Sequence, residues 1–151
     1  MGVQFSLRAL KNCLNCDVLF KHGRNTLGLY CSNKCQQELA YKKNIQAWKA
    51  GTKPGWVGKT KKLAVWLRKF ILERDNFACV KCTWNKRHNL DGLPLVEVNH
   101  IDGNAENCKE ENLETLCPCC HSETPNFRRR NSKSTRIRYA PSCRKRQTKR
   151  T

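Results

Sequence analysis

The sequence predicts an α+β protein made of two small modules, each held together by a zinc ion. Three observations predict this class. Cysteines occur in closely spaced pairs in both halves of the chain, and only 38% of the 151 residues are hydrophobic, so neither half can bury a large core. One stretch has the apolar period of a helix, and another has the β-branched content of a strand. Bound metal is therefore the expected source of stability.

Cysteine usage also indicates the compartment. The chain contains 11 cysteines, an odd number, and most form pairs with two or three residues between the two cysteines. This spacing, and an N-terminus without an apolar signal segment, favour metal thiolates in a reducing cytoplasm over secreted disulfides. No run approaches the roughly 18 apolar residues that a membrane span needs. We therefore expect a cytoplasmic protein that does not enter a membrane.

Two sets of four cysteines have the spacing of tetrahedral zinc sites, in which each of two knuckles donates two sulfurs about 2.3 Å from the ion. In the second set Cys119 is an alternative ligand to Cys120, which we prefer because its two-residue gap matches that of the other knuckle. Cys108 and Cys143 are interpreted as free thiols. The two sets are Cys13, Cys16, Cys31 and Cys35, and Cys79, Cys82, Cys117 and Cys120.

Two helices are predicted. Ser32 is suited to cap a helix that begins near residue 33, continues through Trp48 and stops at Gly51. Thr60 is suited to cap a second helix, which ends at Asp75. Its apolar residues fall on one stripe at helical period: Leu63, Trp66, Leu67, Phe70 and Ile71.

Strand signals are weaker. Residues 21–29, rich in glycine and polar residues, predict a short hairpin between the two knuckles of the first set. Residues 94–100 are rich in β-branched and apolar side chains, and Asp102 and Gly103 follow as a turn. We therefore expect a strand that ends at His100 and enters a loop.

Composition divides the chain into four parts. We expect an N-terminal zinc-binding module at residues 1–49, of zinc-ribbon or treble-clef type, and a second zinc module at residues 63–127. A basic linker rich in glycine and lysine, residues 50–62, joins them and is expected to lie along the partner rather than pack in a core. Residues 128–151 form a basic tail that we expect to be disordered until it binds.

The formal net charge is +18, and it is unevenly distributed. Residues 63–126 hold 7 basic and 10 acidic residues, whereas residues 1–62 hold 12 and 2, and residues 127–151 hold 11 and none. Two tetrathiolate zinc sites would lower the net charge to about +14, which is still strongly basic. Cationic flanks around a mildly acidic centre predict a polyanionic partner.

One segment between the two halves of the second cysteine set carries a recognisable pattern. It consists of Asn99-His100-Ile101-Asp102-Gly103-Asn104, then Glu111-Asn112-Leu113, then Cys120-His121. The pattern resembles the HNH nucleases of the ββα-metal class, and more closely the free-standing HNH homing endonucleases of bacteriophages. The likeness extends over nearly the whole chain. It implies that residues 63–127 are an HNH nuclease domain, active in the cytoplasm of a bacterial host if a phage encodes it.

The resemblance also implies roles. His100 becomes the general base, Asn112 a brace for the turn that presents His100, and Asn99 and His121 ligands of one catalytic divalent ion, Mg²⁺, Mn²⁺ or Ni²⁺. Imidazole suits the base role because its pKa lies near 6.5. The implied activity is hydrolysis of double-stranded DNA, by nicking or cutting, and without a visible dimer stripe we expect a monomer. The expectation is that the cysteines bring the two imidazoles to opposite sides of one phosphate.

Asn99 departs from the family pattern, in which Asp or His often stands at this position. An amide oxygen can bind a hard cation but brings no charge, so the metal site would be neutral. Asp102 is an alternative carboxylate. The departure keeps open a second function, a zinc-dependent nucleic-acid-binding protein without catalysis. A third, a zinc-dependent interaction module without a nucleic-acid partner, conflicts with the charge.

Phosphate contacts are expected from the basic residues that follow the nuclease domain, because they lie close in sequence to the metal segment. These contacts would position the duplex without reading its sequence. The residues are Arg128, Arg129, Arg130, Lys133, Arg136 and Arg138.

Overall fold

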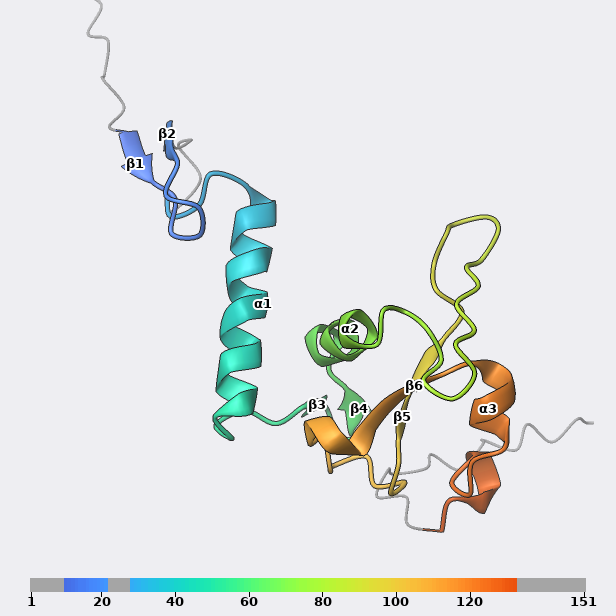
Figure 1. Cartoon of the computed structure of the whole chain (residues 1–151). Coiled ribbons are helices and arrows are strands. Elements are labelled where there is room, and N and C mark those ends of the chain that lie inside the picture. The colour runs from blue at the N-terminus through green and yellow to red at the C-terminus, as the bar shows by residue number, and fades with distance from the viewer. Residues whose placement is uncertain (1–9, 22–27, 133–151) are drawn as a thin grey trace, which may run out of the picture. The chain divides into compact units, whose positions relative to one another are not determined.

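The computed structural model describes residues 10–21 and 28–132, and the chain divides into two compact units, Met1–Lys53 and Pro54–Thr151 (Figure 1). It is a mixed helix and strand protein with short strands throughout. The expected contacts of Lys133, Arg136 and Arg138, and the free thiol of Cys143, lie outside the described residues. Within the described residues, no helix has the length and apolar character of a membrane span.

The first unit begins with two short antiparallel strands, β1 (Leu10–Asn12) and β2 (Leu19–Lys21). The connection between them contains the first cysteine knuckle and is closed by a 3.0 Å hydrogen bond from the Cys13 amide to the Val18 carbonyl. This hairpin therefore encloses the first knuckle. Of the predicted hairpin at residues 21–29, the segment 22–27 lies outside the described residues.

Helix α1 (Asn33–Lys49) confirms the first helix prediction. The Ser32 hydroxyl accepts a hydrogen bond of 3.2 Å from the Cys35 amide, which caps the N-terminus. At the other end Gly51 adopts a φ of 72°, a conformation that glycine tolerates and most residues do not. The cap therefore orders the first turn, from which Cys35 projects.

The second unit is built of short elements, among them two antiparallel strand pairs. Strand β5 (Glu97–His100) pairs antiparallel with β6 (Leu113–Leu116), so that His100 lies opposite Leu113 and Asn99 opposite Glu114. Helices α2 and α3 both contact this pair (Figure 1). The remaining elements are β3 (Trp56–Val57), β4 (Lys62–Leu63), α2 (Val65–Arg74), α3 (Pro118–Ser122) and the two 3₁₀ turns Glu110–Asn112 and Arg128–Arg130.

The second helix prediction is correct in its core face but wrong at its start. Helix α2 begins at Val65, and its N-cap is Ala64, which makes no side-chain capping bond. Thr60, the expected cap, lies in the turn between β3 and β4. Leu67 and Ile71 of the predicted stripe are fully buried. The apolar period identified the helix, but Leu63 was assigned to it although it belongs to a strand.

The predicted linker is only partly a linker. Residues 54–63 belong to the second unit, where β3 pairs with β4 and the Lys61 ammonium lies 3.4 Å from the centroid of the Trp56 ring. Gly55 packs so closely against the core that an added Cβ would overlap the side chains of Cys108 and Leu67. The segment therefore packs against the core at Gly55, which was not expected of a linker, whereas Pro54, residues 57–59 and Lys62 are exposed.

The end of α2 is fastened to β6 by two charged side chains. The Arg74 guanidinium donates to the carbonyls of Leu113 and Glu110 at 2.7 and 2.9 Å. The Asp75 carboxylate accepts from the Thr115 amide at 3.1 Å and pairs with Arg74. Burial raises the pKa of Asp75, but these hydrogen bonds outweigh it and hold the pKa below its usual value. The ionised pair thus positions α2 against the strand pair.

The close approach at Gly55 gives a test of the packed hairpin. Replacing Gly55→Ala should lower the free energy of unfolding by about 1–3 kcal/mol, because the added methyl group has no room beside Leu67 and Cys108. Urea denaturation of the zinc-loaded protein measures this. Val57→Ala, at an exposed position in the same hairpin, is the matched control and should change stability by less than about 0.5 kcal/mol. Equal stability of both variants would show that residues 54–63 do not pack as described.

Candidate metal centres and the histidine face

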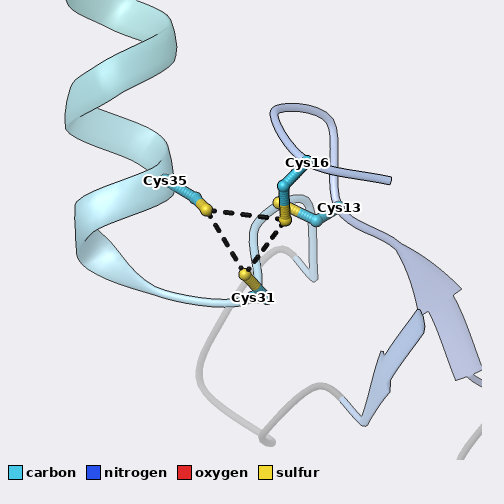
Figure 2. Close-up of side chains that lie close together, drawn as sticks. All are labelled: Cys13, Cys16, Cys31 and Cys35. Atoms are coloured by element: carbon cyan, nitrogen blue, oxygen red, sulfur yellow. Dashed lines mark hydrogen bonds between the residues drawn. The ribbon is translucent and has the colours of Figure 1, made fainter. Parts of the chain in front are cut away.

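Four cysteines of the first unit converge on one point (Figure 2). Their sulfur atoms all lie within 4.8 Å of one another. The Sγ atoms of Cys16, Cys31 and Cys35 are 3.4 to 3.7 Å apart. A tetrahedron with zinc–sulfur bonds of about 2.3 Å requires sulfurs about 3.8 Å apart. The set Cys13, Cys16, Cys31 and Cys35 therefore has the dimensions of a zinc site, as the spacing predicted.

The second unit holds a matching cluster of Cys79, Cys82, Cys117 and Cys120. The Sγ atoms of Cys82 and Cys117 are 3.7 Å apart. Cys119, the alternative ligand, is not in the cluster, and its side chain is exposed. The preference for Cys120 is therefore confirmed, since α3 turns Cys120 toward the other three sulfurs.

The thiols of these clusters are electrostatically adapted to a cation. Burial raises the pKa of Cys79, but hydrogen bonds from the backbone amides of Cys117, Cys82 and Lys81 lower it to about 6. In the first cluster the neighbouring sulfurs of Cys35 and Cys16 raise the pKa of Cys31 to about 12. The thiolate of Cys79 is thus stabilised in advance, whereas the raised pKa of Cys31 keeps that thiol protonated until a dication offsets the repulsion.

Helix α3 starts at the second cluster and carries His121 onto the face of the β5–β6 pair. His121 Nδ1 lies 2.8 Å from a carboxylate oxygen of Glu97 on β5. Asn99, two residues further along β5, lies on the same face because strand side chains alternate. Its amide nitrogen donates to Glu114 of β6 at 3.0 Å. The structure thus pairs each of the two residues that the sequence grouped, Asn99 and His121, with a carboxylate that the sequence analysis did not identify.

His100 leaves β5 from the opposite face. It is 7% exposed, and its Nε2 lies 3.6 Å from the sulfur of Cys108, which is also buried. Cys108 in turn borders Gly55 and Leu67, on the side of α2. The His100 ring is thus directed into the interior, so the expectation that the two imidazoles lie on opposite sides of one phosphate is not met. Cys108 is a free thiol, as predicted, and it lies in the core in contact with His100.

Asn112 braces the turn after His100. Its side-chain oxygen accepts from the Asp102 amide at 3.1 Å, and its nitrogen donates to the Asp102 carboxylate at 2.9 Å and to the Asn107 carbonyl at 2.7 Å. Asn112 is 9% exposed, so these bonds compete little with water. This is the arrangement expected of a brace.

Asp102 is occupied within this turn. One carboxylate oxygen accepts from the Asn104 amide at 2.8 Å and from Asn112, and the other accepts from Asn107 at 2.7 Å. Burial raises the pKa of Asp102, but these bonds outweigh it and hold the pKa below its usual value. Asp102 is therefore a structural residue of the turn, which leaves Asn99 as the better candidate ligand.

Two of the arginines beyond α3 contact this part of the fold. The Arg130 guanidinium donates to the Ser122 carbonyl at 3.0 Å, at the C-terminal end of α3. The Arg128 guanidinium lies 4.9 Å from the centroid of the Phe127 ring, and Phe127 meets the His121 ring edge to face at 5.2 Å. The start of the basic tail therefore lies close to the face that carries His121.

The sequence analysis missed Glu97 and Glu114. The sequence contains a signal for Glu97, which lies two residues before Asn99, so an alternating strand predicts that they share a face. The partner of Asn99 depends on the register of β5 and β6, which only the folded structure supplies.

Comparison with protein-family models, curated proteins and solved structures found no match to this chain.

The two clusters make a stoichiometric prediction. Cys79→Ser should lower the zinc content of the purified protein from two ions per chain to one, because three thiolates no longer complete the tetrahedron. Cys119→Ser, a matched control one residue from a ligand, should retain two. Elemental analysis by mass spectrometry measures both. Loss of zinc in the Cys119 variant instead would overturn the ligand assignment.

Proposed function

We propose that the chain is a zinc-stabilised HNH endonuclease that hydrolyses phosphodiester bonds of double-stranded DNA. One observation carries the proposal: the Glu97–His121 hydrogen bond holds the imidazole of α3 over the same short strand that ends at His100. Asn99 and His100 lie on β5, Asn112 in the 3₁₀ turn before β6, and His121 on α3. The cysteine cluster at the start of α3 and the hydrogen bonds by which Asn112 braces the turn after His100 also support this proposal.

In this proposal each residue has a chemical task. His100 accepts a proton from the attacking water, a role that suits an imidazole at neutral pH. Asn99 and His121 would hold a divalent cation, Mg²⁺, Mn²⁺ or Ni²⁺, which supplies charge stabilisation for the phosphate and the departing 3′ oxygen. Because His100 is nearly buried, the base role requires its ring to reach water when DNA binds. Asn112 holds the turn that follows His100.

Charge supports DNA as the substrate. The net charge of +18 is concentrated outside residues 63–126, so the basic segments flank the residues proposed to react. Arginine and lysine neutralise phosphates and make binding depend on salt. The first arginines after α3 lie next to the His121 face, where they can hold phosphates beside the one that is cut.

A second candidate is a zinc-dependent nucleic-acid-binding protein that does not cleave. Two observations favour it: His100 is buried against Cys108, and Asn99 supplies no charge for a cation. The basic flanks serve this function equally well. The two candidates therefore differ in cleavage and agree in binding.

A nicking assay separates the candidates. The zinc-loaded protein should convert supercoiled plasmid to nicked or linear DNA with Mg²⁺, Mn²⁺ or Ni²⁺, and His100→Ala should lower the rate by about 10²-fold or more because the general base is lost. His88→Ala, which removes a half-exposed histidine elsewhere in the unit, is the control and should retain activity. DNA binding without cleavage by the wild-type protein would favour the second candidate, and full activity of the His100 variant would exclude His100 as the base.

Asn99→Asp tests the metal ligand and its neighbour together. The new carboxylate would lie against Glu114, so without added divalent cation its repulsion should cost about 1 kcal/mol or more of unfolding free energy. Repulsion raises the pKa of such a pair, so this loss should be absent near pH 4 and grow as the pH rises toward 8. The magnesium concentration needed for cleavage should fall, because the ligand gains charge. Thermal unfolding and magnesium titration measure the two effects, and an unchanged magnesium requirement would contradict the assignment of Asn99.

A further inference from the structure

The face of the β5–β6 pair that meets α3 carries two polar pairs of the same kind. Each joins a carboxylate to one of the two residues proposed to hold the cation: Glu97 to His121, and Glu114 to Asn99. We propose that Glu97 and Glu114 are positioning residues that orient an imidazole nitrogen and an amide oxygen toward one divalent cation. This inference rests on the proposed function and adds to it two residues outside the HNH-like pattern.

The first pair determines which nitrogen of His121 carries the proton. An ionised carboxylate only accepts hydrogen bonds, so the 2.8 Å contact with Glu97 requires the proton on Nδ1. In the neutral ring Nε2 then keeps its lone pair, which is the form that binds a metal ion. Carboxylates commonly hold metal-binding histidines in this way and raise their basicity.

The second pair determines how the amide of Asn99 is turned. Glu114, opposite Asn99 in the strand register, accepts at 3.0 Å, and only the nitrogen of an amide can donate. The carbonyl oxygen of this planar group therefore points away from Glu114. Amide oxygens are ligands of hard cations, so the bond turns Asn99 into an oxygen ligand instead of a competing donor.

The two carboxylates also supply the charge that the ligands lack. Imidazole and amide are both neutral, which leaves a dication without a counter-charge in direct contact. Glu97 and Glu114 together place two negative charges immediately behind them. Glu97 is 60% exposed, so much of its charge is screened, whereas Glu114 on β6 is less exposed. The departure at Asn99 is thus compensated in part, one hydrogen bond away.

Direct metal binding tests the proposal without relying on cleavage. Mn²⁺ binding is measured by electron paramagnetic resonance on full-length protein that retains two zinc ions per chain. Glu97→Ala and Glu114→Gln should each weaken Mn²⁺ binding about 10- to 100-fold, the usual effect of losing such a supporting group. Glu106→Gln is the matched control: it removes a charge from an exposed position of the same unit, outside the HNH-like pattern, and should leave the affinity unchanged within about twofold.

A spectroscopic measurement isolates the orienting role. Nitrogen-15 NMR of His121 in protein without added Mn²⁺ should show the neutral ring protonated at Nδ1, and in Glu97→Ala the ring should shift toward protonation at Nε2. A purely structural role for Glu97 would not move this equilibrium. An unchanged tautomer, or unchanged Mn²⁺ affinity in both variants, would overturn the proposal.

The outcomes separate this inference from the proposed function. Cleavage of plasmid that depends on His100, combined with wild-type Mn²⁺ affinity in the Glu97 and Glu114 variants, would refute the positioning role alone. If the wild-type protein, with both zinc sites filled, binds no Mn²⁺, the positioning role is refuted. If the same protein also fails to cleave plasmid, the nuclease is refuted as well.

Discussion

The second cysteine cluster is the constraint on which the functional half of the chain depends. Cys79 follows α2, and Cys117 directly follows β6. Cys117 also caps α3 by accepting a 3.3 Å hydrogen bond from the Cys120 amide. One ion held here would therefore fix the end of a helix, the end of a strand and the start of a five-residue helix at once. Such a short helix is not stable alone, and the apolar residues around the cluster, Leu116 and Trp84, are few. The position of His121 is thus a consequence of thiolate geometry rather than of a large core.

The features that the sequence predicted correctly are those governed by short-range rules. Cysteine spacing identified both clusters and the choice of Cys120 over Cys119, and a serine cap with a glycine stop identified α1. Residues 54–63 were misjudged because proline, glycine and lysine are typical of linkers, and only the space left beside Cys108 explains why Gly55 stands there. Local composition does not reveal a contact between residues more than 50 positions apart. The pairing of Asn99 with Glu114 was missed for another reason: it depends on the register of β5 against β6.

The candidate site shows the same difference between what short-range rules predict and what only the fold determines. Motif spacing grouped Asn99, His100 and His121, but a strand sends neighbouring side chains to opposite faces, and spacing alone does not say which face each one takes. Asn99, itself only 9% exposed, shares a face of β5 with Glu97, which contacts His121, while His100 enters the core beside Cys108. A histidine in that position is sheltered from the water whose proton it would have to accept. Catalysis by this residue would therefore require a rearrangement when DNA binds, and binding without catalysis would not.

A neutral ligand pair backed by carboxylates has a further physical consequence for the proposed nuclease. Charge one hydrogen bond removed from a cation attracts it less than charge in direct contact, because Coulomb energy falls with distance and water screens the remainder. The proposed site would therefore hold its cation weakly until a DNA phosphate adds a charged oxygen ligand. By thermodynamic linkage, the cation would then strengthen DNA binding by the same factor as DNA strengthens cation binding. An Asn at position 99 in this arrangement would confine tight metal binding to the complex with DNA, whereas an Asp would allow it in the free protein.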